Sequence, residues 1–449
     1  MPALSPMRYA VLLGVLMTVL CAGNLSAETE TDRIAQEIQL MKQRIQQLEA
    51  LLKKSQAEEK QVDEQPVVEA GDETPHVVES ETEVAQAESE TTEAAPDGIK
   101  VGGAVRLQYS NERYNQGNRE RGGDFDFDIF RLNLDGTIGD VILSAEWRWF
   151  QYMNVVHHAW FGYDFTEQTQ GQLGIHKVPF GVLPYNSHNF FFSSNYYVGL
   201  EDDYDAGIKF LHKTGPWDLR FGFYLNDEQG GADGFVDNRE DRYSYDVVGY
   251  RVAGEGTFDE PANILAENNT WNARVAHLWV VNDQLKIELG ASGQYGLLHN
   301  GSDKVGDHDA YAIHLVGDYG PWNLQLQASA YEYDVDGGAD LMAVGAYSFY
   351  DTIPAEADSY TANIAYSLPV AWGPITNLTF YNDYSLITNK SANLDDTWMN
   401  VLGVAVSAGG LYTYIDFVSA ENQPFIGGSM GSNSGETEHR FNINLGYYF

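Results

Sequence analysis

Cysteine is almost absent from this 449-residue sequence, in which Cys21 is the only one. It lies in an expected secretory signal at residues 1–27, where Arg8 precedes the apolar run 9–22 and residues 25–27 (LSA) offer a small-residue cleavage site. The mature chain is therefore expected to have no cysteine, which excludes disulfide bonds and thiolate chemistry.

Basic residues and long apolar runs are also scarce. The sequence has 26 Lys and Arg against 65 Asp and Glu, for a formal net charge of −39. Such acidity argues against a nucleic-acid partner. Beyond the N-terminus, no apolar run approaches the ~18 residues that a membrane helix needs.

Aromatic residues and glycine are abundant, with 28 Tyr, 21 Phe and 44 Gly. An aromatic-rich, glycine-rich chain without membrane helices is typical of transmembrane barrel strands. In such strands apolar and polar positions alternate, which dilutes the hydropathy signal.

Two segments separate the signal from the strands. Residues 28–54 carry apolar positions at spacings of four and three: Ile34, Ile38, Met41, Ile45, Leu48 and Leu52. This seam predicts a short coiled coil and leaves the number of helices open, a single amphipathic helix lying on a surface being the alternative. In residues 55–97, fourteen acidic residues stand against Lys60 alone, which indicates a disordered acidic linker.

From Gly98 to the C-terminus, alternation predicts an all-β domain of sixteen antiparallel strands. The expected strands are 98–110, 125–138, 141–152, 154–164, 169–180, 204–212, 216–226, 269–282, 284–297, 308–319, 321–333, 357–370, 373–386, 396–407, 410–420 and 437–449. Short turns alternate with longer loops, as in outer-membrane barrels, in which the short turns are periplasmic. With both termini on the short-turn rim the strand number must be even, so residues 339–350 are assigned to a loop.

The last strand shows the alternation most clearly. Phe441, Ile443, Leu445, Tyr447 and Phe449 occupy one face, and polar residues or glycine occupy most of the positions between them. A strand at the chain end leaves an exposed edge unless it pairs with another strand. Closure into a transmembrane β-barrel is therefore expected.

The register of each strand predicts which charges face the lumen. A cation at mid-membrane on the lipid face costs about 2–4 kcal/mol, so cations on barrel strands are expected to point inward. The cations expected to line the pore are Arg106, Arg131, Arg148, Lys209, Arg220 and Arg274. Lys177 would face lipid by strict alternation, but it lies two residues before Pro179, and we expect its ammonium to reach the pore mouth.

The long loop at 181–203 is the expected constriction. It carries three consecutive phenylalanines, Phe190 to Phe192, which a position inside the barrel would shelter from water. Its acidic end is Glu201, Asp202 and Asp203. Carboxylates opposite a basic wall would create a transverse field at a narrow point.

Several of these segments resemble the phosphate-selective porin O and P family of Gram-negative outer membranes. The resemblance rests on GIHKVPFG at 174–181, LTFYNDYS at 378–385, NVLG at 400–403 and the closing strand that ends in Phe449. It implies a homotrimeric sixteen-stranded channel whose third loop constricts the pore. Phosphate selectivity in that family depends on dense Lys and Arg, whereas residues 98–449 have 19 Lys and Arg against 46 Asp and Glu.

Three other functions remain open. A coiled coil ahead of a porin barrel is also reminiscent of sugar porins, which makes saccharide uptake an alternative. An outer-membrane hydrolase would need a His, a Ser and an acid near the rim, and the candidates are His157, His158, His188, Ser187, Ser193 and Ser194. A structural tether is disfavoured, because about eight strands suffice for an anchor.

The sequence therefore predicts a passive outer-membrane channel for small hydrophilic solutes and ions, anions such as phosphate among them. We expect a homotrimer in contact with outer-membrane lipid and lipopolysaccharide, with a periplasmic contact through the coiled coil. No catalytic residue, metal or cofactor is expected.

Deletion of residues 28–97 should leave a folded, open channel, because this segment contributes no strand to the barrel. Heat-dependent migration on SDS gels and conductance in planar bilayers measure the two properties. A truncated protein that fails to insert or to conduct would show that the segment is required.

Overall fold

The computed structural model describes residues 98–449. The expected signal sequence, coiled coil and acidic linker lie outside the described residues. No helix within residues 98–449 is long and apolar enough to cross a membrane.

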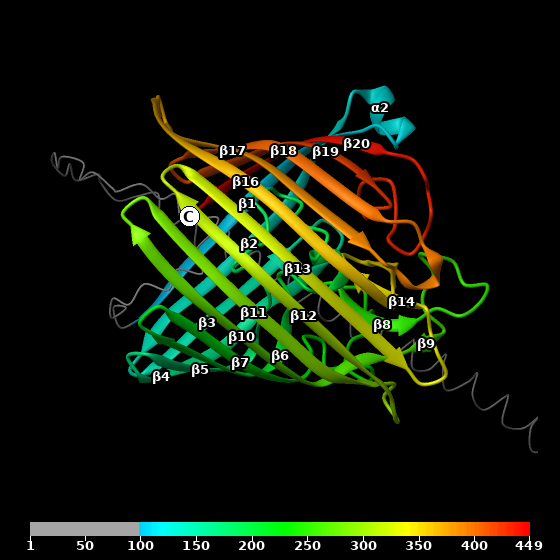
Figure 1. Ribbon diagram of the computed structural model, residues 1–449. Coiled ribbons are helices and arrows are strands. Elements are labelled where there is room, and N and C mark those ends of the chain that lie inside the picture. The colour runs from blue at the N-terminus through cyan, green and yellow to red at the C-terminus, as the bar shows by residue number, and fades with distance from the viewer. Residues whose placement is uncertain (1–97) are drawn as a thin grey trace, which may run out of the picture. The chain divides into compact units, whose positions relative to one another are not determined.

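Sixteen strands of the described chain form one closed antiparallel barrel (Figure 1). In barrel order they are β1 (Gly98–Glu112), β2 (Asp124–Ile138), β3 (Val141–Trp149), β4 (Asn154–Thr166), β5 (Thr169–Lys177), β6 (Tyr204–Thr214), β7 (Trp217–Asp227), β10 (Ala266–Asn282), β11 (Leu285–His299), β12 (Lys304–Tyr319), β13 (Trp322–Val335), β16 (Glu356–Trp372), β17 (Ile375–Thr388), β18 (Thr397–Ala408), β19 (Leu411–Glu421) and β20 (Glu438–Tyr448). Each expected strand corresponds to one of these, so the strand number is confirmed.

A smaller sheet lies among the long connections, in the order β15-β14-β8-β9. Its strands are β8 (Asp246–Tyr250), β9 (Asn263–Ile264), β14 (Leu341–Ala346) and β15 (Phe349–Pro354). The prediction that residues 339–350 lie outside the barrel, made because the strand number must be even, is confirmed. The segment nevertheless forms strands, because β14 pairs with β8 from another connection, a long-range contact that a local pattern does not contain.

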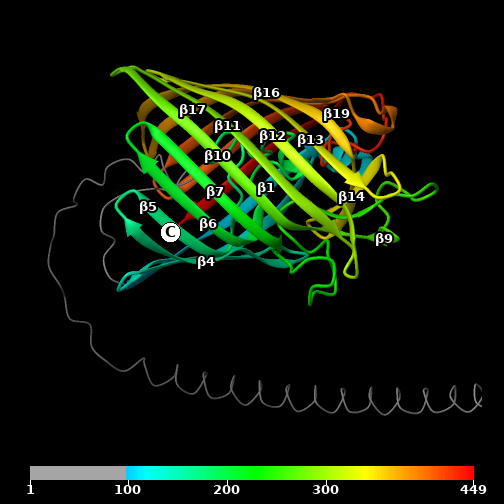
Figure 2. The same cartoon turned by 60° about the horizontal axis from the view of Figure 1, so that its bottom comes forward.

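Short helical turns complete the described secondary structure. The helix α2 (Gln116–Arg121) follows β1, and two 3-10 turns, Tyr196–Val198 and Ser391–Asn393, lie in connections. In Figure 1, β8, β9 and β14 gather at one end of the barrel, and the C-terminus lies toward the other end, where the two-residue turns are. Figure 2 shows the same separation after rotation.

The two faces of β20 follow the alternation in its sequence. Phe441, Leu445 and Tyr447 are exposed on the outside of the barrel, whereas Asn442 and Asn444 are buried on the inside. Polar side chains thus point into the lumen and apolar side chains point outward. The same alternation recurs on the other barrel strands, so the outer surface carries the exposed large hydrophobic residues.

The chain end closes the barrel. The backbone N–H of Gly103 donates to the Phe449 carbonyl at 2.9 Å, and the Phe449 N–H donates back to the Gly103 carbonyl at 3.1 Å. From Ala104 to Glu112, β1 then pairs residue by residue with β20. This seam leaves no barrel strand of the described chain with an unpaired edge.

Replacement of Gly103 by Ala should destabilise this seam by about 1–3 kcal/mol, because overpacking of a close contact costs that much. A Cβ at this position would lie 2.4 Å from the Arg131 carbonyl oxygen and 2.9 Å from the Phe449 ring. Gly317→Ala is the matched control, since its nearest neighbour would be 3.9 Å away. The temperature at which the folded band disappears on SDS gels measures the effect, and equal temperatures for the two variants would contradict it.

Candidate functional site: a charged lumen narrowed by an inserted loop

The connection between β5 and β6, residues 178–203, folds into the barrel. The Gly181 N–H donates to Ser292 Oγ on β11 at 3.0 Å, and the Val182 N–H donates to Gln327 Oε1 on β13 at 2.8 Å. These two strands lie about halfway round the barrel from β2 and β3. The expectation that this loop enters the lumen is therefore confirmed.

His188 fixes the loop most firmly. Its ring Nδ1 lies 2.8 Å from Asp383 Oδ1 and its Nε2 lies 2.7 Å from Asn323 Oδ1. Asn323 keeps its oxygen toward His188 because its Nδ2 donates to Asp318 at 2.7 Å. With an acceptor at each nitrogen, the ring is an imidazolium. Burial lowers the pKa of His188, but the Asp383 carboxylate outweighs burial and holds the pKa above its ordinary value.

The loop presents aromatic rings to the remaining space. Phe192 stacks on Tyr196 with ring centroids 4.5 Å apart, and Tyr185 lies 5.6 Å from Phe192. Phe191 is buried beneath them. Sheltering of the triple phenylalanine by the barrel is thus confirmed.

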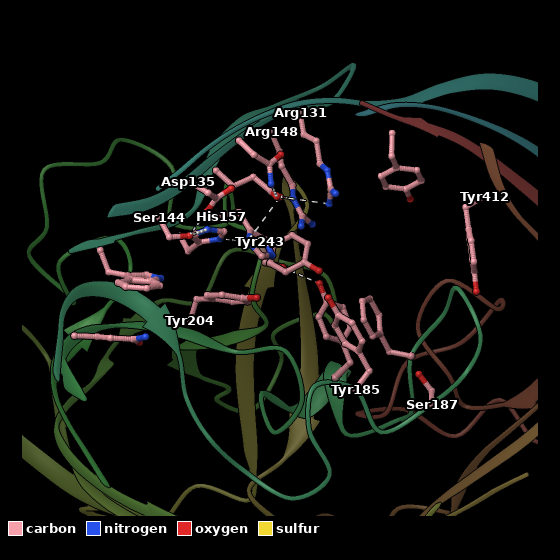
Figure 3. A pocket seen from close by; sticks show the side chains of 18 of the residues that line it. Arg131, Asp135, Ser144, Arg148, His157, Tyr185, Ser187, Tyr204, Tyr243 and Tyr412 are labelled. Carbon is pink, nitrogen blue, oxygen red and sulfur yellow. Dashed lines mark hydrogen bonds and ion pairs between the residues drawn. The ribbon is translucent and has the colours of Figure 1, made fainter. Parts of the chain in front are cut away.

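A cavity of about 2000 Å³ lies between the loop and the barrel wall (Figure 3). Strands β1 to β7 supply most of the wall residues that line it, and β12, β13, β16, β17, β19 and β20 together add a few more. Its lining begins at Gly139 and Asp140, in the short β2–β3 turn, and reaches Phe150 and Tyr152 in the turn between β3 and β4 at the opposite rim. The cavity therefore runs along most of the length of the wall. In Figure 3, Arg131 and Arg148 stand on one side of it and Tyr185 on the other.

Five of the expected pore residues line this cavity: Arg106, Arg131, Arg148, Lys209 and Arg220. Four of them are ion-paired. Arg106 lies 2.7 Å from Asp128, Arg220 lies 2.9 Å from Asp218, and Glu146 pairs with both Arg131 and Arg148. Lys209 donates to the Lys177 carbonyl at 2.8 Å. Arg274 also points inward, but it is buried and donates to the Gly181 carbonyl at 2.8 Å, so it supports the loop.

The other four expected residues lie behind the lining. Lys177 is buried, with its ammonium 2.7 Å from Asp202. Glu201 accepts hydrogen bonds from the Asn186 and Ser193 N–H groups, at 2.8 and 3.0 Å, and so ties the loop to itself. Burial raises the pKa of Glu201 to about 7.

The surface that faces the basic wall is consequently aromatic, whereas an acidic loop end was expected there. Asp202 accepts from the Tyr243 hydroxyl at 2.5 Å, and Asp203 turns toward the long-loop rim. The difference arises because a buried carboxylate needs donors, and the loop supplies them away from the cavity.

Carboxylates that the sequence analysis did not single out balance the cations of the lining. The cations are Lys100, Arg106, Arg131, Arg148, Lys209, Lys213, Arg220 and Arg440, and the carboxylates are Asp126, Asp128, Asp135, Asp140, Glu146, Asp164, Glu167 and Asp318. Strict alternation from Arg131 would have turned Asp126 and Asp128 to lipid, but the β1–β2 pairing shifts register at Asp128 and brings both to the lumen. The lumen is therefore close to neutral although the chain is strongly acidic.

Both His157 and His158 line the cavity, although adjacent residues of a regular strand point to opposite faces. The pairing of β3 with β4 shifts register here, since Glu146 pairs with His158 and Trp147 pairs with Val156. His157 is the extra residue of this β-bulge, and its Nδ1 lies 2.9 Å from His158 Nδ1.

A chain of hydrogen bonds continues from these rings. Ser144 Oγ lies 2.9 Å from His158 Nε2 and donates to Asp135 at 2.6 Å. In a hydrolytic triad the carboxylate orients the histidine, and the histidine accepts the serine proton. Here the serine hydroxyl donates its hydrogen bond to the carboxylate and not to the histidine, so the arrangement favours a polar lining over nucleophilic catalysis.

Two of the three candidate loop serines have structural partners, whereas the buried Ser187 Oγ makes no hydrogen bond and so has no histidine as a base. Ser193 Oγ donates to Glu201 at 2.5 Å, and Ser194 Oγ lies 2.7 Å from Ser385 Oγ. His188, the neighbour of Ser187, is held by Asp383 and Asn323. None of these contacts supports the hydrolase alternative.

The fold is that of a sixteen-stranded porin-type barrel. The anion-selective porin of Comamonas acidovorans matches with a TM-score of 0.50 and 14% identity, over 78% of this chain and 99% of that one. OmpF of Salmonella typhi, in complex with daunomycin, matches with a TM-score of 0.49 and 9% identity, over 79% and 98%. OmpT of Vibrio cholerae, in its trimer form, gives 0.47 and 14%, over 78% and 99%.

No protein-family model matches the chain. No curated protein matches it either. At these identities, the likeness to the Comamonas porin is one of fold.

Loss of the His188 anchor should free the loop. Replacement of Asp383 by Asn removes the charge-assisted contact, which is worth about 1.5–3 kcal/mol, and should increase both the mean single-channel conductance and its fluctuations. Asp358→Asn is the control, because Asp358 lies at the end of β16 and accepts only from exposed Asn389.

The pH dependence of the current fluctuations should follow the protonation of His188. A raised pKa in the folded protein means that the anchor is at full strength below the ordinary value of ~6.5 and weakens as the pH rises through the raised value. Current fluctuations should therefore grow above neutral pH in the wild type and should be independent of pH in Asp383→Asn. Identical pH profiles for the two proteins would contradict this role.

Proposed function

We propose that the protein is a porin, a passive channel for small hydrophilic solutes and ions across the outer membrane of a Gram-negative bacterium. The observation that carries the proposal is the cavity, which follows the wall from the short-turn rim to Tyr152 and is lined by charged side chains. Soluble enzymes close their cores with apolar side chains, whereas a barrel lumen lined by ionisable groups suits water and ions. The inserted loop narrows this path and so limits the size of the solute.

The outer surface supports a position in a membrane. Large apolar side chains such as Phe221, Leu289 and Leu445 are exposed there, and water would disfavour so extended an apolar surface. Trp217, Trp322 and Trp372 are exposed beside the short turns. Tryptophan concentrates at the interface between lipid and water, so this rim would lie at the membrane boundary.

The basic wall gives the channel a local preference for anions. The Arg106 guanidinium lies 5.1 Å from the Phe190 ring centroid, so a solute that passes the loop meets this cation at close range. Each wall arginine has a carboxylate partner, which would weaken the preference compared with an unpaired ladder. A modest anion preference is therefore proposed, without a dedicated phosphate site.

Saccharide transport is the second candidate. Rings that line the cavity, among them Tyr185, Phe190 and Tyr412, offer flat surfaces on which sugar rings would stack. Paired arginines and carboxylates nearby would supply hydrogen-bond donors and acceptors for hydroxyl groups. A sugar that blocks the ion current in a concentration-dependent way would favour this candidate over a general ion pathway.

A homotrimer is proposed as the assembly, on the strength of the sequence resemblance to trimeric porins. We propose that residues 28–54, if they form the coiled coil that their sequence predicts, add a periplasmic contact. Outer-membrane lipid and lipopolysaccharide are the expected surroundings of the barrel.

Reversal potentials in planar bilayers test whether the cations that line the cavity set the anion preference. The double variant Arg106→Gln with Arg131→Gln removes two cations, so that Asp128 loses its partner and Glu146 keeps only Arg148. Loss of one charge ~4 Å from a permeating ion in water is worth about 1 kcal/mol, so the permeability to a monovalent anion should fall by about five-fold and the anion-to-cation permeability ratio by at least as much.

The matched control is Arg119→Gln with Lys304→Gln, two exposed cations outside the cavity lining. Arg239 and Arg242 are unsuitable for this purpose, because both are ion-paired beneath the surface. Equal shifts from the wall pair and the control pair would mean that the total surface charge sets the selectivity. Absence of conductance in the wild type would refute the channel itself.

A further inference from the structure

Three carboxylates converge where the inserted loop rejoins the barrel. Asp203 is the last residue of the loop, Asp205 is the second residue of β6, and Asp246 is the first residue of β8 in the small sheet. Oxygen atoms of the three lie within 4.8 Å of one another. The three residues are only 9, 4 and 6% exposed, so water screens the repulsion between their carboxylates only weakly.

The surroundings compensate only part of this negative charge. The carboxylates of Glu228 and Glu267 act on the cluster, and Asp227 on β7 is the cross-strand partner of Asp205. The two guanidiniums at this place are those of Arg239 and Arg242. Arg239 lies 3.1 Å from Asp227, and Arg242 contacts Asp227 and Glu228, both at 3.3 Å, and also Asp246.

Glu267, which also lies near the cluster, interacts with a tyrosine hydroxyl and a histidine ring. Glu267 accepts from the Tyr333 hydroxyl at 2.8 Å and lies 3.4 Å from His308 Nε2. Neither contact reaches the cluster. Six carboxylates therefore share two guanidiniums.

Two buried oxygens at this place accept no hydrogen bond. Asp203 Oδ1 is one of them, and Oε1 of Glu228, whose side chain is 6% exposed, is the other. A buried carboxylate oxygen without a donor is costly, and a cation is one of the few groups that would satisfy several such oxygens together.

We propose that Asp203, Asp205 and Asp246 bind a divalent cation of the calcium class, with Glu228 beside the site. The ligands are oxygens alone, which suits a hard cation rather than zinc. Ca²⁺–oxygen distances of about 2.3–2.6 Å allow two ligand oxygens to stand up to ~5 Å apart, which accommodates the 4.8 Å spread. Mg²⁺ demands ~2.0–2.1 Å and near-ideal octahedral geometry, so it should bind more weakly.

The site would act as a clamp. Asp203 belongs to the loop that narrows the lumen, Asp205 to the barrel and Asp246 to the small sheet. One cation would therefore hold three separate parts of the chain together. Three protein carboxylates with water in the remaining positions suit the weak affinities of extracellular calcium modules, about 10⁻⁴–10⁻³ M.

A calcium titration of the full-length folded protein tests the proposal without any measurement of transport. The protein is treated with EDTA, exchanged into chelator-free buffer and titrated with CaCl₂ in a calorimeter. We expect one Ca²⁺ per chain, a higher temperature of unfolding on SDS gels in Ca²⁺ than in EDTA, and a smaller effect of MgCl₂ at equal concentration.

Asp203→Asn and Asp205→Asn should each weaken Ca²⁺ binding by about ten-fold or more, because each removes one charged ligand. Asp237→Asn is the matched control. Asp237 is an exposed acid that lies between β7 and β10 in the chain, as the ligand Asp246 does, and this variant should bind Ca²⁺ as the wild type does. Asp246→Asn is less suitable, because Asp246 also pairs with Arg242.

Absence of binding heat and of a thermal shift in the wild type would overturn the proposal, and this result needs no variant to fold. Binding that survives in both Asp203→Asn and Asp205→Asn would overturn it as well, because the cation would then lie elsewhere. Asp203→Asn that is more stable than the wild type in both EDTA and Ca²⁺ would identify a shared proton in place of a cation. Channel activity enters none of these outcomes, so they are independent of the transport function.

Discussion

Continuous pairing of the strands is the constraint on which the rest of this structure depends. A sheet that ended anywhere would expose a row of unpaired backbone groups, and no side chain could compensate for that in lipid. The Gly103–Phe449 hydrogen bonds remove the last such edge. The approach of the terminal ring to β1 is close enough that position 103 has no room for a Cβ. Once the barrel is closed, side-chain alternation gives it an apolar exterior and a polar interior.

The polar interior determines where the inserted loop, residues 178–203, can make its hydrogen bonds. A segment inside the lumen must satisfy its backbone groups on the wall, and the loop does so through Ser292, Gln327 and Asp383. His188 adds a charge-assisted contact in which both ring nitrogens are donors. The loop thus contacts the β11–β17 side of the barrel, and the cavity that remains is lined mainly by β1 to β7. Its aromatic residues fill the space where it meets Tyr243 and Tyr347 of the other connections.

Charge pairing explains how a strongly acidic chain retains a nearly neutral lumen. Inside the barrel, burial makes an unpaired charge costly, so each wall arginine has a carboxylate within reach. At the long-loop rim the pairing breaks down, and Asp203, Asp205 and Asp246 crowd together with too few guanidiniums nearby. The two places differ because strand register matches charges across neighbouring strands, whereas the rim collects residues from connections that no register relates.

The sequence by itself determined the sixteen strands, the even count, the two rims and the inward direction of Arg106, Arg131, Arg148, Lys209 and Arg220. These properties are local: a period of two sorts side chains between faces, and turn residues mark where each strand ends. The tertiary structure alone decided the partners of those side chains. The bulge at His157, the β8–β14 pairing, the burial of Lys177 against Asp202 and the convergence of Asp203 with Asp246 all join segments far apart in the chain or break the local period. Such contacts depend on closure of the barrel and on the need of buried charges for partners. Both bring together residues that are far apart in the chain, so no local sequence pattern predicts them.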